Sequence, residues 1–187
     1  DPTQGPACAI AAGAATMFRN FFVPVAGGEG QTAARQVDCL ADVGRALGND
    51  NGVLWSMKNG YALARAGGLA VVAGRLASLE SNGRNVLRDR LRVGVHRDVE
   101  VTARGAGHPV SQVFCSALPV AYGDAPASAW EPFARLVLEG AYEATMWAAV
   151  LNAHATGRRV VYLTRLGGGA FGNDPAWIDA AMDRAVT

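Results

Sequence analysis

The residues with the clearest chemical potential lie near the C-terminus, where an apolar stretch at 160–164 leads into a glycine-rich loop and then into a helix start at Asp174-Pro175. Small residues in such a loop let backbone N–H groups face a ligand, and the helix beside them adds unpaired amides and the positive end of its dipole. This layout is typical of an anion site, with a phosphate ester as the first candidate ligand. A plain strand-to-helix connection is the alternative.

The spacing of apolar residues predicts four helices. This spacing indicates helices at 32–47 and 67–80, and a longer one that starts near Ser128, with Glu131 at capping-box distance, and ends at Gly157. A last helix after the loop is expected to bury Ile178, Ala181, Met182 and Ala185.

Strands are predicted from alternating valines at 91–102, around a polar turn, and from a second apolar run centred on 113–115. The long helix and the apolar stretch 160–164 follow, which together make a βαβ crossover. We therefore expect one α/β domain over residues 1–187. In such sheets ligands gather at the carboxyl ends of strands, where the glycine loop falls.

Composition narrows the possible functions. The chain has 187 residues, half of them apolar, and a net charge of +1, so no strong attraction to nucleic acid or to an anionic membrane is expected. Its apolar runs are too short to cross a bilayer. No metal or cofactor is expected either, because the three histidines lack i, i+4 pairing and no Cys-x-x-Cys pair occurs.

The cysteines and the first residue bear on where the protein works. Cys8, Cys39 and Cys115 are too few and too widely spaced for a disulfide framework, which favours a reducing compartment and hence a cytoplasmic protein, with a secreted effector as the alternative. No signal peptide is visible. The chain begins at Asp1 without a methionine, as a mature form, a trimmed chain or a domain of a longer protein would.

Three segments together resemble one known family. Residues 167–175, Gly-Gly-Gly-Ala-Phe-Gly-Asn-Asp-Pro, are similar to the Gly-Cys-Gly-Ala-Phe-Gly-Asn/Gly-Asp motif of the poly(ADP-ribose) glycohydrolase branch of the macro-domain superfamily. Residues 27–38 resemble its upstream signature, a glycine cluster followed about eight residues later by Gln-Glu-Glu, and Asn20 precedes them where the family places a ligand-contacting Asn or Ser. Residues 113–121 resemble the family strand that ends in a small-residue-proline segment. The order of the blocks agrees, and they span most of the chain.

The resemblance implies a macro-domain-like mixed sheet sandwiched between helices, with ADP-ribose in a cleft between two glycine-rich loops. The diphosphate would rest on backbone N–H groups. Phe171 would pack against ribose, with a core position under the loop as the alternative. The implied ligand-binding residues are Asn20, Gly27, Gly28, Gly167, Gly168, Gly169, Ala170, Phe171, Gly172 and Asn173. Candidates for stacking on adenine are Trp55, Tyr61, Tyr122 and Trp130.

The chain departs from the family at the catalytic signature, where Gln36-Val37-Asp38 replaces Gln-Glu-Glu. In the family, the glutamate nearest the anomeric carbon protonates the leaving oxygen and then activates water. The resemblance carries this role to Asp38, supported by Gln36, provided that the helix brings the shorter side chain closer to the sugar. Asp38 and Asp42 would share a helix face, and their mutual repulsion could raise the pKa of one of the two. The alternative is that both are solvated surface carboxylates.

The function that follows from the resemblance is an ADP-ribosyl hydrolase that removes ADP-ribose from a modified target. The alternative is a reader that binds ADP-ribose without cleaving it, and a third hypothesis is another enzyme that processes ADP-ribose or a nucleotide. The expected partner is ADP-ribose or an ADP-ribosylated macromolecule. Arg165, just before the loop, is expected either to pair with a phosphate or to reach into water.

Overall fold

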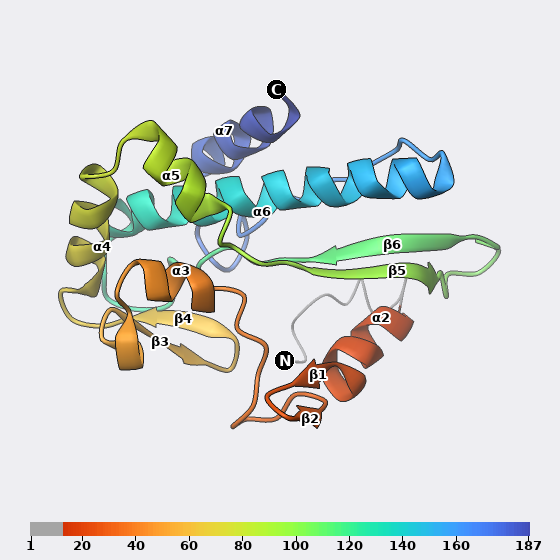
Figure 1. The fold of residues 1–187 in the computed structure, drawn as a ribbon, viewed down its shortest axis with the longest axis horizontal. Helices are drawn as coiled ribbons and strands as arrows, with labels where there is room; N and C mark the ends of the chain where they lie inside the picture. Colours follow the sequence, from red (N-terminus) through yellow and green to blue (C-terminus); the bar gives the residue numbers. More distant parts are fainter. Residues whose placement is uncertain (1–12) are drawn as a thin grey trace. The chain divides into compact units, whose positions relative to one another are not determined.

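The computed structural model describes residues 13–187 and divides the chain into two compact units (Figure 1). Unit 1 contains the described residues up to Asp38 together with Gly94–Phe114. Unit 2 contains Cys39–Val93 and Cys115–Thr187. Each unit therefore has a discontinuous sequence, and the two glycine-rich segments singled out above belong to different units. The expectation of a single domain over residues 1–187 stays a prediction.

The predicted macro-domain-like mixed sheet is wrong. The described strands form three separate two-stranded sheets, β1–β2, β3–β4 and β5–β6, and all three are antiparallel hairpins. The βαβ crossover fails because residues 160–164, expected as its second strand, pair with no strand in the described chain. The fold is a mixed α/β arrangement without a continuous sheet between helices.

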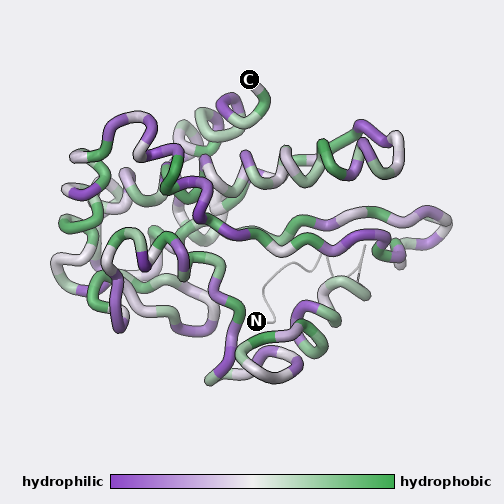
Figure 2. The backbone as a smooth tube through the Cα atoms, in the orientation of Figure 1, coloured by the Kyte–Doolittle hydropathy of each residue, from purple (hydrophilic) through white to green (hydrophobic). Residues whose placement is uncertain are grey.

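Unit 1 is built around one long hairpin. Its elements are α2 (Gly13–Met17), the π-helix η1 (Phe18–Phe22), β1 (Pro24–Val25), β2 (Gly28–Glu29), β5 (Gly94–Glu100) and β6 (Pro109–Phe114). The valine alternation correctly predicted β5, but the expected polar turn is a bulge within the strand, because the register shifts between His96 and Val99 and Asp98 takes a positive φ. Figure 2 shows hydrophobic residues along both strands of this hairpin, and Val99 packs with Ala15 in a small core.

Unit 2 is mainly helical. Its elements are α3 (Ala41–Ala46), the 3-10 helix η2 (Asp50–Gly52), β3 (Trp55–Lys58), β4 (Tyr61–Ala64), α4 (Gly68–Ala77), α5 (Ser81–Arg88), α6 (Ala127–Thr156) and α7 (Pro175–Val186). The main core lies here, and its largest fully buried side chains include Trp130, Tyr142, Phe133, Leu118 and Ile178. Burial of Phe133 and Ile178 agrees with the apolar spacing of the sequence, whereas burial of Trp177 was not expected.

One predicted helix start and one predicted helix cap are wrong, and each has a local cause. The helix expected from Thr32 begins only at Ala41, because Thr32 and Arg35 exchange backbone hydrogen bonds of 2.8 and 3.2 Å in a tight turn. The long helix begins after Pro126, which makes no side-chain cap. Instead of completing a capping box, Glu131 accepts from Arg135 Nε at 2.8 Å.

Helix ends were predicted more reliably. Gly157 ends α6 with a left-handed backbone at φ 75°, and Asp174 caps α7 by accepting from the N–H of Ala176 at 2.7 Å. The predicted helix at 67–80 is α4. These features depend on residues a few positions apart, so the sequence alone carries their signals.

Candidate functional site

A buried tyrosine on α6 holds the entry to the glycine-rich loop. The Tyr142 hydroxyl donates to the carbonyl of Thr164 at 2.7 Å and accepts from the N–H of Leu166 at 2.9 Å. Burial raises the pKa of this hydroxyl above its usual value, so it stays protonated and can donate at neutral pH. Sequence reasoning missed this anchor. The available signal was a tyrosine on the apolar face of a helix, because a buried phenol needs a hydrogen-bonding partner.

The loop has a defined internal shape. The N–H of Gly172 donates to the carbonyl of Gly169 and the N–H of Asn173 to the carbonyl of Gly167, both at 3.0 Å. The carbonyl of Phe171 accepts from the N–H of Ala121 at 2.9 Å. Gly167 and Gly172 adopt φ of 72° and 69°, which glycine takes without strain. The loop is thus a closed turn attached to the segment before α6.

Three consecutive N–H groups of this loop have no acceptor in the described chain and can bind a ligand. Within residues 13–187, no group accepts from the N–H groups of Gly169, Ala170 or Phe171. Gly168, Gly169 and Ala170 are exposed, and a Cβ built on Gly169 would meet nothing within 4 Å. A row of exposed donors without acceptors suits an anion.

The start of α7 offers fewer N–H donors to an anion than the sequence suggested. The Asp174 carboxylate already accepts from the N–H of Ala176, and the Asp174 carbonyl accepts from the N–H groups of Trp177 and Ile178 at 3.0 and 3.3 Å. First-turn donors that were expected to face a ligand are therefore satisfied within the protein. The loop amides, rather than the helix terminus, are the donors left for an anion.

Asn173 connects the loop to the core. Its side chain is only 3 % exposed, and Nδ2 donates to the carbonyl of Leu118 at 2.8 Å. Its Oδ1 is buried and has no hydrogen-bond partner in the described part of the chain. Its side-chain amide therefore fixes the loop to the segment before α6, while the expected ligand contact stays a prediction.

We expect Asn173→Asp to lower the free energy of unfolding by about 3 kcal/mol at pH 7, because a carboxylate replaces a donor beside buried carbonyl oxygens. The new group should have a raised pKa in the folded state. Stability should then be greatest below about pH 4, where the acid is protonated in both states, and fall as pH rises through the raised pKa. Urea unfolding against pH, with the wild type as reference, measures this. Wild-type stability at pH 7 would contradict the role assigned to Asn173.

An aromatic cluster adjoins the loop. Phe171 contacts Tyr61 and Tyr122 with ring centroids 5.7 and 5.4 Å apart, and the two tyrosines are 5.4 Å from each other. Phe171 also packs against the main core, which agrees with the alternative of a core position under the loop. Among the candidates for stacking on adenine, Trp55 and Trp130 are buried, whereas Tyr122 is exposed. Only the tyrosines keep a ring surface near the loop.

The side chain of Arg165 binds to residues of α7. Its guanidinium pairs with Asp179 at 2.5 Å and donates to the carbonyl of Pro175 at 3.4 Å. The pair lowers the pKa of the Asp179 carboxyl and raises that of Arg165, mainly through their hydrogen bond. Both side chains are more than half exposed. Arg165 thus braces the stem of the loop against α7.

The residues proposed for catalysis lie in unit 1, on irregular chain. Gln36 and Asp38 are half-buried, and Val37 is exposed rather than part of a core stripe. The expected shared helix face of Asp38 and Asp42 is wrong, because α3 begins after Asp38. Asp42 is instead paired with Arg45 and Arg92.

Gln31 brings two of the predicted site segments of unit 1 together. Its N–H donates to the carbonyl of Asn20 at 2.7 Å, and its Nε2 donates to the carbonyl of Arg19 at 2.8 Å. Its Oε1 accepts from the N–H of Val37 at 3.0 Å. One side chain therefore connects the helix that carries Asn20 to the segment 36–38.

The first glycine cluster forms a hairpin turn. Ala26 and Gly27 have φ of 45° and 77°, which is typical of a tight two-residue turn between β1 and β2. The Arg35 guanidinium lies against Gly28, where a Cβ would collide with it, and donates to the carbonyl of Glu29 at 3.0 Å. Chain geometry alone explains both glycines, and their contact with a ligand stays a prediction.

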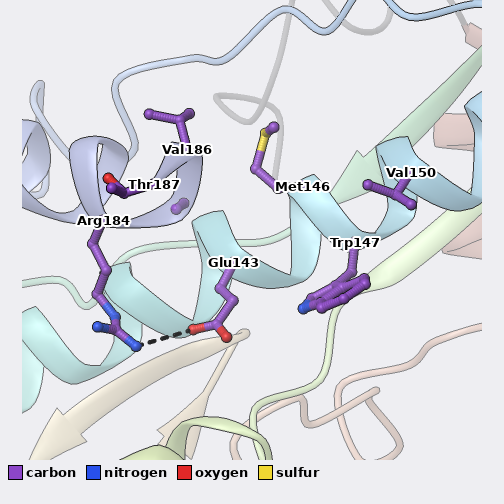
Figure 3. A pocket seen from close by; sticks show the side chains of 8 residues that line it. Glu143, Met146, Trp147, Val150, Arg184, Val186 and Thr187 are labelled. Atoms are coloured by element: carbon purple, nitrogen blue, oxygen red, sulfur yellow. Dashed lines mark ion pairs between the residues drawn. The ribbon is translucent and has the colours of Figure 1, made fainter.

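Unit 2 also has a hollow at the far end of α7 from the glycine-rich loop. The hollow, of about 750 Å³, lies between α6 and the end of α7. Figure 3 shows Met146, Trp147, Val150 and Val186 among the side chains that line it. Glu143 and Arg184 pair across it at 3.7 Å. The glycine loop meets α7 at its other end, so this hollow is not part of the predicted site.

Other features bear on the composition-based expectations. Over residues 13–187, no cluster of three or more His, Cys, Asp or Glu side chains is arranged to hold a metal ion. No described helix is long and apolar enough to cross a membrane. Burial raises the pKa of the Cys115 thiol, and Cys8 lies outside the described residues.

Comparison with known proteins adds no assignment: no protein-family model, curated protein or solved structure matches this chain.

Proposed function

We propose that this protein binds an ADP-ribosyl group and holds its diphosphate on the loop between Leu166 and Gly172. The observation that carries this proposal is the row of exposed, unaccepted N–H groups at Gly169, Ala170 and Phe171. Backbone donors in a preformed turn bind phosphate oxygens without needing a basic patch, which suits a chain with net charge +1. The proposal depends on this loop and its neighbours, not on a macro-domain fold.

The aromatic cluster supports a nucleotide rather than a simple phosphate. Phe171 stands at the end of the amide row, so a sugar attached to the bound diphosphate would lie within reach of its ring. Tyr122 exposes a face next to Phe171, where a base can stack. A ligand with a base, a ribose and a diphosphate can use both features, whereas inorganic phosphate can use only the amides.

Titration calorimetry with ADP-ribose on the wild type and on Gly169→Val tests the proposal. A Cβ at this position meets nothing within 4 Å, so a valine should cover the amide row while the fold survives. We expect binding to weaken about 100-fold, as the loss of one or two hydrogen bonds to a charged group would produce. Gly168 is less suitable, because its Cβ would press on Ile178 at 3.2 Å.

The matched control is Gly74→Val on α4, an exposed glycine in the same unit whose Cβ also meets nothing within 4 Å. This variant should bind ADP-ribose like the wild type. Absence of heat from the wild type at millimolar ADP-ribose would refute the proposal, as would equal affinities for the wild type and Gly169→Val.

Hydrolysis of an ADP-ribosyl group is the second candidate function. The observation that favours it is the attachment of Asn20 and residues 36–38 to one residue, Gln31, through its backbone N–H and its side chain, because the resemblance assigns ligand contact and catalysis to these segments. Asp38 would protonate the departing oxygen and then activate water, with Gln36 orienting the reactants. Val37 in place of the family's glutamate favours the binding function alone.

A further inference from the structure

The chain between α6 and the glycine loop runs back along the helix it has just left (Figure 1). At one end the N–H of Arg158 donates to Thr156 Oγ1 at 3.3 Å, and at the other the carbonyl of Thr164 accepts from the Tyr142 hydroxyl at 2.7 Å. From Tyr142 to Thr156 the helix rises about 21 Å. Seven residues of extended chain cover about 23 Å. Residues 157–164 are therefore nearly fully extended beside the second half of α6.

This segment has the properties of a β-strand except a partner. Val160 and Tyr162 are 73 % and 91 % exposed, whereas Val161 is less exposed and Leu163 packs against the main core, so the side chains alternate between solvent and protein. In the part of the chain that the structure describes, nothing accepts from the N–H groups of residues 159–163 and nothing donates to their carbonyl groups. Such an edge is ready for pairing with another strand.

We propose that residues 159–163 pair in antiparallel fashion with the same residues of a second copy of this chain. A two-fold axis at Val161 places Val160 opposite Tyr162 of the other copy. Pairs of an aromatic and a β-branched residue are favourable across antiparallel strands. The same register sets Arg159 opposite Leu163, so no like charges face each other. The segment is self-complementary, as a symmetric dimer requires.

The exposed side chains of the segment contribute apolar area to a dimer. Tyr162 and Val160 are 91 % and 73 % exposed. At 150–250 Å² for a buried aromatic side chain, Tyr162 alone offers roughly 150 Å² or more per copy. A standard interface takes about 800 Å² per partner, so the paired strands supply part of what a stable dimer needs.

Analytical ultracentrifugation of the full chain over about a hundredfold range of concentration tests the dimer. We expect a monomer–dimer equilibrium in the wild type. In Tyr162→Asp the dissociation constant should rise at least tenfold, because a charge enters the paired face. The matched control is Val86→Asp, an exposed aliphatic residue on α5, which should dimerise like the wild type. If Tyr162→Asp does not fold, Val160→Asp provides the same test.

Hydrogen exchange identifies the surface involved. The amides of residues 159–163 should become protected as concentration rises through the dissociation constant. Protection of the same amides in a purely monomeric sample would mean that the segment pairs within its own chain, and this would overturn the proposal. A wild type that stays monomeric throughout, or a Tyr162→Asp variant that dimerises normally, would also overturn it.

Discussion

Gly167→Val is expected to lower the free energy of unfolding by about 4 kcal/mol, from strain at a positive φ together with overpacking. Gly167 adopts φ 72°, a conformation that a β-branched residue strongly disfavours. A Cβ at this position would also collide with the Asn173 amide and lie 2.5 Å from the Ala117 Cβ. The loop cannot relieve both conflicts without losing the hydrogen bond between Asn173 and Leu118.

Urea unfolding of Gly167→Val beside Gly169→Val measures this effect. The two variants carry the same new side chain in the same loop, but Gly169 has open space around it. Gly169→Val should therefore keep stability close to the wild type while losing affinity for ADP-ribose, and Gly167→Val should lose stability. Equal stabilities for the two variants would mean that the loop lacks the closed shape described above.

Asp38→Ala is expected to reduce turnover of an ADP-ribosylated substrate by about 100-fold to 10,000-fold, the usual contribution of a general acid–base group. Binding of free ADP-ribose should change little, because the proposed diphosphate contacts come from the loop of unit 2. Asp38→Glu restores the longer side chain of the family and should retain activity. Release of ADP-ribose, followed over time under saturating substrate, provides the measurement.

Asp89→Ala is the control for this experiment, since Asp89 is an exposed carboxylate at the end of α5, away from the predicted site segments in the sequence. It should turn over substrate like the wild type. Unchanged turnover in Asp38→Ala would remove the catalytic assignment. A wild type that binds ADP-ribose tightly and releases nothing from the substrate would establish the binding function alone.

Predictions that depended on neighbouring residues agree best with the structure. The apolar spacing of α4 and α7, the valine alternation of β5 and the glycine that ends α6 each express a preference of a few adjacent residues. Such preferences act before the chain is folded, so they can be identified in the sequence.

Predictions that depended on residues far apart in the sequence agree less well with the structure. Residues 160–164 have strand-forming composition, yet a strand also needs a neighbouring strand, and the described chain provides none. Similarly, residues 32–40 have helical spacing, but a turn at Thr32 and the side chain of Gln31 take the backbone groups that a helix would use. In both cases, other interactions override the local pattern.

The candidate site shows the same division. By itself, the sequence determined the glycine-rich loop, its small exposed residues and the aspartate that caps the following helix, because these are properties of contiguous chain. Only the tertiary structure decided that Tyr142 and Asn173 hold the loop in place, that Tyr61 and Tyr122 meet Phe171, and that Arg165 is taken up by Asp179. These contacts join residues 14 to 110 positions apart, and such pairings are made by packing of the folded chain.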